Sequence, residues 1–140
     1  MKTVTRLALV GIGLFVGLSG WERPDGLTDE ELTSRLVGTW ITDETGSNYR
    51  FYGENSFHRD GMHSADEVMH ADGETTKWSF NGVWDVKNGK LLASGEVMRS
   101  DREAVERYEV EEQIERVDRD ELVLVNAQGT RLVRHRRRSD

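Results

Sequence analysis

The chain of 140 residues contains no cysteine and a single proline. Without cysteine, disulfides, zinc–thiolate sites, thiol catalysis and a cysteine-linked lipid anchor are all excluded. Common enzyme signatures are also missing, since the sequence has no Gly-x-Ser-x-Gly, no Walker loop and no His-Glu-x-x-His. We therefore expect a protein that is not an enzyme and that needs no cofactor.

Positive charge is scarce as well, because 19 Lys and Arg stand against 26 Asp and Glu, giving a net charge of −7. Such an acidic surface argues against nucleic acid as the main partner. Basic residues gather only at the C-terminal end, at Arg131, Arg134, His135, Arg136, Arg137 and Arg138. This run predicts either peripheral contact with anionic membrane lipids or, as the preferred alternative, ion pairs with the Glu-rich segment 106–115.

A long hydrophobic run occurs only at the N-terminus, where Lys2 and Arg6 precede the apolar residues 7–18. The charge and length are typical of a secretory leader, because a bilayer span needs about 20 apolar residues. We expect residues 1–20 to be a signal peptide and the protein to be exported, either periplasmic or secreted. An uncleaved membrane anchor is the less favoured alternative. The remaining residues suffice for one domain with a modest core.

A short helix is expected next, in residues 21–37. Residues 21–26 contain the proline and indicate a linker. The sequence Thr-Asp-Glu-Glu at 28–31 is a capping box, which predicts a helix from Asp29 to about Val37, with Gly38 as its C-terminal stop.

Residues 78–99 predict a long β-hairpin. Even positions from Trp78 to Val86 are apolar or glycine, whereas the odd positions are polar apart from Val83. This alternation is typical of a strand with one buried face, and Asn88-Gly89 favours a two-residue type I′ turn. On the buried face the implied pairs are Val86 with Leu91, Trp84 with Ala93, Gly82 with Gly95, Phe80 with Val97 and Trp78 with Arg99. The glycine pair would leave a dent in mid-strand.

Shorter strands separated by turns are expected at 39–42, 48–52, 56–60, 121–126 and 130–136. Residues 61–73 lack the strand pattern, and a second capping box at 64–67 predicts one or two helical turns or an ordered loop there. Residues 101–116 fit a strand or a helix, and we prefer the strand. The sum indicates an all-β fold, an antiparallel up-and-down β-barrel of about eight strands with a short N-terminal helix.

Several residues resemble those of lipocalins, and especially of short bacterial lipocalin-like domains. They are Leu36-Val37-Gly38-Thr39-Trp40 after a short helix, Phe51 and Phe57 around a turn, the Gly129-Thr130 hairpin and arginines in the last strand. The resemblance covers about residues 28–137, with the barrel at 38–137 and a basic tail end at 138–140. It departs from full lipocalins in lacking a helix after the last strand and a Thr-Asp-x-x-Tyr motif.

The lipocalin resemblance implies structural roles for Gly38 and Trp40, with Arg134 or Arg136 stacked on the Trp40 ring as a cation–π partner. It also implies binding of a small hydrophobic or amphipathic molecule inside the barrel. We expect Trp78, Phe80, Trp84, Val97, Tyr108 and Glu112 to bind it.

The role of Glu112 in such a cavity is to orient a polar head group. A buried carboxylate is costly, so we expect Glu112 to have an arginine partner or a raised pKa. In the alternative interpretation the aromatic side chains pack on one another. The barrel core is then filled, and the protein is an accessory module of the cell envelope that works through its surface.

A metal site is a more distant alternative. If residues 65–71 are helical, His63, Glu67 and His70 lie at i, i+4 and i+7 on one face, as a possible two-His-one-carboxylate set. The preferred interpretation of this segment is a solvated loop.

Overall fold

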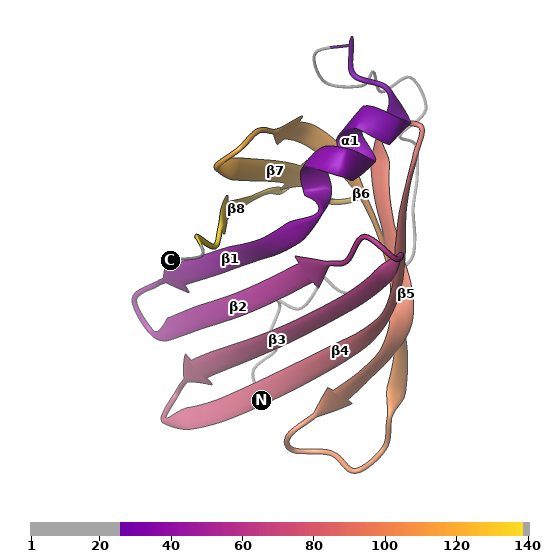
Figure 1. Ribbon diagram of the computed structural model, residues 1–140. Coiled ribbons are helices and arrows are strands. Elements are labelled where there is room, and N and C mark those ends of the chain that lie inside the picture. Colours follow the sequence, from indigo (N-terminus) through magenta and orange to yellow (C-terminus); the bar gives the residue numbers. More distant parts are fainter. Residues whose placement is uncertain (1–25, 139–140) are drawn as a thin grey trace.

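The computed structural model describes residues 26–138, which form a closed antiparallel barrel of eight strands behind one short helix (Figure 1). Each strand pairs with the next, and β8 closes the barrel against β1. The predicted fold class is confirmed. The signal peptide expected at residues 1–20 lies outside the described residues. The elements are α1 (Asp29–Leu36), β1 (Gly38–Thr45), β2 (Tyr49–Phe57), β3 (Met62–Ala71), β4 (Glu74–Lys87), β5 (Lys90–Arg99), β6 (Glu106–Val117), β7 (Glu121–Val125) and β8 (Arg131–Arg136).

Within residues 26–138, no helix is long and apolar enough to cross a bilayer.

Helix α1 lies across one end of the barrel (Figure 1). The predicted capping box is present: the Glu31 amide donates to Thr28 Oγ1 at 3.1 Å, and the Thr28 amide donates to Glu31 Oε1 at 2.8 Å. Leu32 and Leu36 are fully buried against the barrel, so the helix closes this end with apolar side chains. Gly38 follows the helix with φ +138°, a conformation that favours glycine.

The β4–β5 hairpin has the register expected from its sequence, with Lys87 opposite Lys90 and Gly82 opposite Gly95. Asn88 and Gly89 form the turn with φ of 55° and 76°. Their two amides donate to the Asp29 carboxylate at 2.8 and 2.9 Å. One side chain at the start of α1 therefore fixes the helix to the hairpin.

Replacement of Asp29 by Ala is expected to lower the free energy of unfolding by about 1–3 kcal/mol, because two charge-assisted hydrogen bonds and an acidic residue in the first helical turn are lost. Urea unfolding at pH 7 measures this change. The control is Glu30→Ala, which removes an exposed carboxylate from the same turn. Equal effects of the two substitutions would contradict the assigned role of Asp29.

Two segments differ from the sequence-based expectation. Residues 53–55 do not form a turn, because β2 runs unbroken from Tyr49 to Phe57. The helical turns expected within 61–73 are also wrong, because this segment is β3, with buried and exposed residues in alternation. Strand β3 pairs along its length with β2 and β4, and these ladders override the local capping preference at 64–67. The preferred strand within 101–116 is confirmed as β6.

The closed end of the barrel is built around Trp40, which is fully buried. The guanidinium carbon of Arg136 lies 4.2 Å from the centroid of the Trp40 ring. Arg136 also donates to the carbonyl oxygens of Val37 at 2.9 Å and Arg35 at 2.8 Å, which terminate the helix. Of the two arginines proposed as the partner of Trp40, Arg136 therefore occupies this position. Arg134, assigned a structural role beside Trp40, projects into the barrel interior instead.

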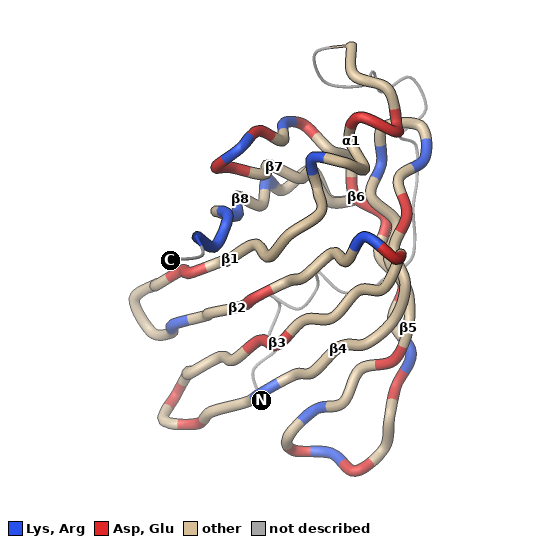
Figure 2. Tube along the Cα trace, in the orientation of Figure 1, with Lys and Arg blue, Asp and Glu red and all other residues tan. Residues whose placement is uncertain are grey.

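The C-terminal arginines lie one after another along the end of β8 and the residues that follow it (Figure 2). Within residues 26–138, only one of these arginines forms the expected ion pair with the Glu-rich strand β6. The others do not, because β7 separates β6 from β8 in the sheet. The observed ion pairs are Arg131 with Glu115, Arg137 with Glu54 and Arg138 with Asp120. All three are exposed in part, so each contributes little to stability.

Candidate functional site

A polar chamber of about 30 Å³ lies inside the barrel. Its polar lining comes from four strands and consists of Asn55, His63, Glu67, Tyr108, Glu112 and Arg134. Its apolar lining consists of Phe57, Phe80, Leu91, Ala93 and Val110. All six polar side chains are at least nine-tenths buried, although polar residues of these types are usually found at protein surfaces.

The paired glycines position one side of this chamber. Register places His63, Gly82, Gly95 and Tyr108 in one row across β3 to β6. A Cβ atom on Gly82 would lie 1.9 Å from the Ser94 carbonyl oxygen, so the two strands approach too closely for any side chain at this point. With no side chain between them, His63 and Tyr108 meet, and Nδ1 of the histidine lies 2.8 Å from the tyrosine hydroxyl.

The protonation of His63 follows from its two partners. Nε2 lies 3.0 Å from Asn55 Oδ1, which only accepts, so Nε2 carries the proton. Burial lowers the pKa of His63 to about 4, with smaller contributions from the charges of Arg134 and His58, so the ring is neutral at pH 7. Nδ1 therefore accepts a hydrogen bond from the Tyr108 hydroxyl, whose pKa is raised by burial to about 12.

Glu112 and Arg134 provide the charge of the chamber. Burial raises the pKa of Glu112 to about 7, although the positive charge of Arg134 acts in the opposite direction. Both features expected of Glu112, a raised pKa and a nearby arginine, are therefore present. Oε2 of Glu112 and Nδ2 of Asn55 are buried without a hydrogen-bond partner. Buried polar atoms of this kind mark sites where another group is needed.

Replacement of Tyr108 by Phe is expected to cost about 1–3 kcal/mol of stability, because Nδ1 of the buried His63 loses its donor. The measurement is urea unfolding at pH 7, together with the midpoint of the His63 ring resonances in an NMR titration. In the wild type this midpoint is expected near pH 4. Tyr52→Phe is a matched control, because the Tyr52 hydroxyl contacts the half-buried Glu54 on the outer face. An unchanged stability in Tyr108→Phe would show that the histidine does not depend on this bond.

Three of the six residues expected to bind a ligand line the chamber, namely Phe80, Tyr108 and Glu112. The other three are buried or half-buried elsewhere. Trp84 packs edge-on against Phe57 and donates from Nε1 to the His58 carbonyl oxygen at 2.8 Å.

Trp78 and Val97 lie farther from the helix than the chamber. Trp78 is buried, and the guanidinium carbon of Arg99 lies 5.8 Å from its ring centroid. Val97 pairs with the inward-facing Phe80 and is half-buried. Both side chains belong to the end of the barrel opposite α1.

The metal set proposed from helical spacing is wrong, because the segment is a strand. Alternation in β3 buries His63 and Glu67 inside the barrel and leaves His70 exposed, where its ring lies 2.8 Å from Thr75 Oγ1. Among the described residues, no group of three His, Cys, Asp or Glu side chains could hold a metal ion.

Four polar residues of the chamber were not assigned to it from the sequence, namely Asn55, His63, Glu67 and Arg134. Odd positions of β2 and β3 face inward. A strand interpretation of 53–55 and 61–73 would therefore have placed the first three residues inside the barrel. The signal was period-two alternation, which the turn and helix signals obscured.

Three apolar side chains on the inward faces of β5, β6 and β8 are partly exposed to solvent. Val97, Val110 and Leu132 share the inward face of their strands yet are only half-buried. We refer to these three residues as the open side. Val110 also lines the chamber, so the open side and the chamber are continuous.

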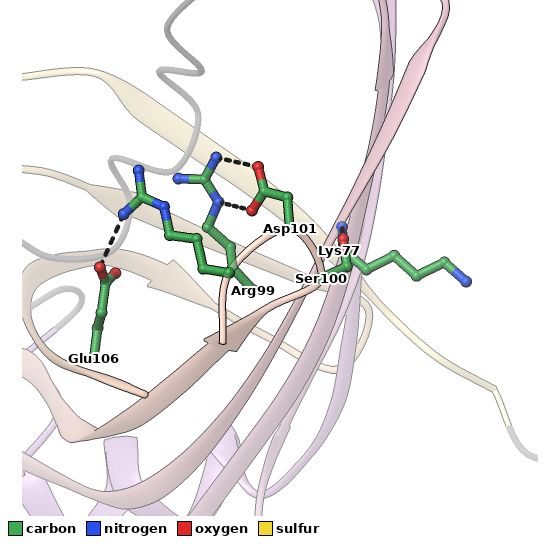
Figure 3. Close-up of polar contacts among 6 residues, drawn as sticks. Lys77, Arg99, Ser100, Asp101 and Glu106 are labelled. Atoms are coloured by element: carbon green, nitrogen blue, oxygen red, sulfur yellow. Dashed lines mark hydrogen bonds and ion pairs between the residues drawn. The ribbon is translucent and has the colours of Figure 1, made fainter. Parts of the chain in front are cut away.

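Ion pairs fix the β5–β6 loop (Figure 3). Arg99 donates two hydrogen bonds of 2.8 Å to Asp101 and thereby lowers the pKa of that carboxyl, and Arg102 donates to Glu106 at 2.9 Å. The Ser100 amide donates to the Lys77 carbonyl oxygen at 2.9 Å. The ion pairs lie within the β5–β6 connection, and the Ser100–Lys77 hydrogen bond joins it to β4.

A wider groove of about 500 Å³ lies over the outer face of β2 to β5. Tyr52, Val68 and Met98 contribute apolar surface to it, and Lys77 and Asp66 contribute charge. Met98 is 56% exposed, so this groove is a surface feature and does not enclose a small molecule.

The sequence matches no protein-family profile and no curated protein. The barrel and the geometry of its chamber are therefore the basis for assigning a function.

Proposed function

We propose that this protein is an exported, lipocalin-like binding protein without catalytic activity, which receives the polar group of a small amphipathic molecule in its chamber. One observation carries this proposal: an interior cavity is lined by buried polar groups, and among them Asn55 Nδ2 and Glu112 Oε2 have no hydrogen-bond partner in the described part of the chain. Each unpartnered buried atom costs about 1–3 kcal/mol. Apolar side chains would fill the same space without this cost, so we would not expect these polar groups in a purely structural interior.

The size of the chamber limits the part of the ligand that it takes. Sites for drug-sized ligands usually measure roughly 300–1,000 Å³. The 30 Å³ observed here suits a head group of a few atoms. An apolar tail then lies along the open side, against Val97, Val110 and Leu132.

Two further features support the relation to lipocalins. Arg136 stacks on Trp40 at the closed end, as the resemblance implies for an arginine of the last strand. The meander order and the helix across one end are also consistent with a lipocalin-like fold. Export rests on the leader-like residues 1–20 of the sequence.

The test is native mass spectrometry of the protein purified without detergent, followed by calorimetric titration with 1-octanol and sodium octanoate. We expect a co-purifying mass or saturable binding of at least one probe. Ala93→Val narrows the chamber and should weaken binding more than tenfold, whereas Ala65→Val, at a buried alanine outside the lining, should not. Absence of a bound mass and of binding by either probe would refute the proposal.

The outer groove favours a second candidate function, a non-catalytic accessory module that contacts another protein of the cell envelope. The groove combines exposed Met98 with Val68 and flanking charges, a composition found at protein interfaces. A cross-linking probe on residue 98 that captures one protein in wild type but not in Val68→Asp would support this function.

A further inference from the structure

Arg134 is a buried cation that must have a negative counter-charge. Its side chain is 6% exposed and lines the chamber from β8, where its positive charge acts on Glu112 and His63. A buried charge without a counter-charge is strongly destabilising. The counter-charge must therefore come from the chamber itself or from a molecule bound there.

The titratable groups that face the chamber are few. His63 and Glu67 face it from β3, and Tyr108 and Glu112 face it from β6. His63 and Tyr108 are neutral at pH 7, since their pKa values are about 4 and about 12. The available negative charges are those of Glu67 and Glu112.

We propose that the chamber is an anion site, in which a carboxylate or sulfonate head group replaces the ionised Glu112 as the counter-charge of Arg134 while Glu112 takes up one proton from solvent. This inference rests on the proposed function and specifies the class of head group. Three donors then surround the anion: the Arg134 guanidinium, the free Nδ2 of Asn55 and the protonated carboxyl of Glu112.

The exchange makes binding depend on pH. Because the pKa of Glu112 is about 7, the carboxyl is protonated in nearly all molecules at pH 5.5 and ionised in nearly all at pH 8.5. Binding of a permanently charged anion should therefore be about 30-fold weaker at pH 8.5 than at pH 5.5, the factor for one linked proton. Binding of an uncharged amphiphile should change much less.

The experiment is calorimetric titration of the full chain at both pH values with octyl sulfonate, which stays ionised throughout, and with 1-octanol. At pH 5.5 we expect octyl sulfonate to bind more tightly than 1-octanol. At pH 8.5 we expect this difference in affinity to disappear. In Glu112→Gln the sulfonate should bind equally at both pH values. The matched control Glu67→Gln removes the other carboxylate of the chamber and should leave the pH dependence unchanged.

The outcomes separate the two proposals. If neither probe binds, the proposed function fails and the anion site with it. If both probes bind with equal affinity at both pH values, the binding function stands and the anion site is refuted. Loss of the pH dependence in Glu67→Gln, with retention in Glu112→Gln, would also refute it.

A second measurement avoids substitutions that could impair folding. Titration of the wild type with octyl sulfonate at pH 7, in two buffers with different heats of ionisation, gives the number of protons taken up on binding. We expect about half a proton per anion at this pH, because the carboxyl is about half protonated beforehand. Binding without proton uptake would refute the exchange.

Discussion

Between pH 4 and pH 8, replacement of Glu112 by Gln is expected to shift the stability difference by about 3 kcal/mol in favour of the variant, almost all of it above pH 4.5. The folded-state pKa of this carboxyl is about 7, against 4.5 for an ordinary glutamate. Between these two values the folded chain binds more protons than the unfolded chain, so the wild type loses stability as pH rises. Below pH 4.5 both states are protonated and the loss disappears.

The measurement is urea unfolding of both proteins from pH 4 to pH 8, read as the difference in free energy at each pH. Taking the difference removes other titrating groups, including His63, whose lowered pKa makes stability fall toward acid pH instead. Glu111→Gln is the control, because Glu111 lies next to Glu112 but is half-buried and forms an ion pair with Lys90. A difference that stays constant across this range would show that burial does not raise the pKa of Glu112, so that the carboxyl ionises inside the barrel as it does in the unfolded chain.

Replacement of Gly82 by Ala is expected to cost about 3 kcal/mol or more, at or above the upper end of the usual range for overpacking and a large share of the roughly 5–15 kcal/mol that stabilises a native protein. The added Cβ atom would lie 1.9 Å from the Ser94 carbonyl oxygen and 2.7 Å from the Cα atom of Gly95. Both are backbone atoms of the paired strand, so β4 and β5 would have to separate. Such a change would also disturb the row that joins His63 to Tyr108.

The control for this prediction is Gly53→Ala in β2. Its Cβ atom would meet the Glu67 side chain at 3.1 Å, a contact that a small movement of that side chain relieves. Thermal and urea unfolding should therefore show a much smaller loss for Gly53→Ala than for Gly82→Ala. Similar losses would mean that the close approach of β4 and β5 does not determine the cost.

The elements that the sequence predicted correctly are those fixed by local chemistry. Thr28 and Glu31 cap α1 through their own side chains, and Asn88-Gly89 favours positive φ whatever surrounds it. Alternation in 78–86 then places alternate side chains inside, and the turn sets the register of the hairpin. None of these features depends on distant residues.

The segments that were misjudged depend on partners remote in sequence. Residues 61–73 carry a helix-capping signal, but they became β3 because β2 and β4 pair with both of its edges. Gly53 was expected in a turn, and it likewise became part of a strand, β2, because of its pairing partners. Once these segments are strands, His63 and Glu67 turn inward and His70 turns outward, so a proposed metal set becomes part of a polar chamber.

The sequence by itself determined the helix, the hairpin register and the all-β antiparallel class, because capping, turn chemistry and alternation act within a few residues, but it divided β2 and omitted β3. It also indicated that Glu112, if it lay inside, would have an arginine partner or a raised pKa. Only the tertiary structure decided which cation lies near it and how much space surrounds it. Closing the barrel brings Arg134 of β8 near Glu112 of β6 and Asn55 of β2. A cavity is the space left between side chains from distant strands, and no local pattern specifies that distance.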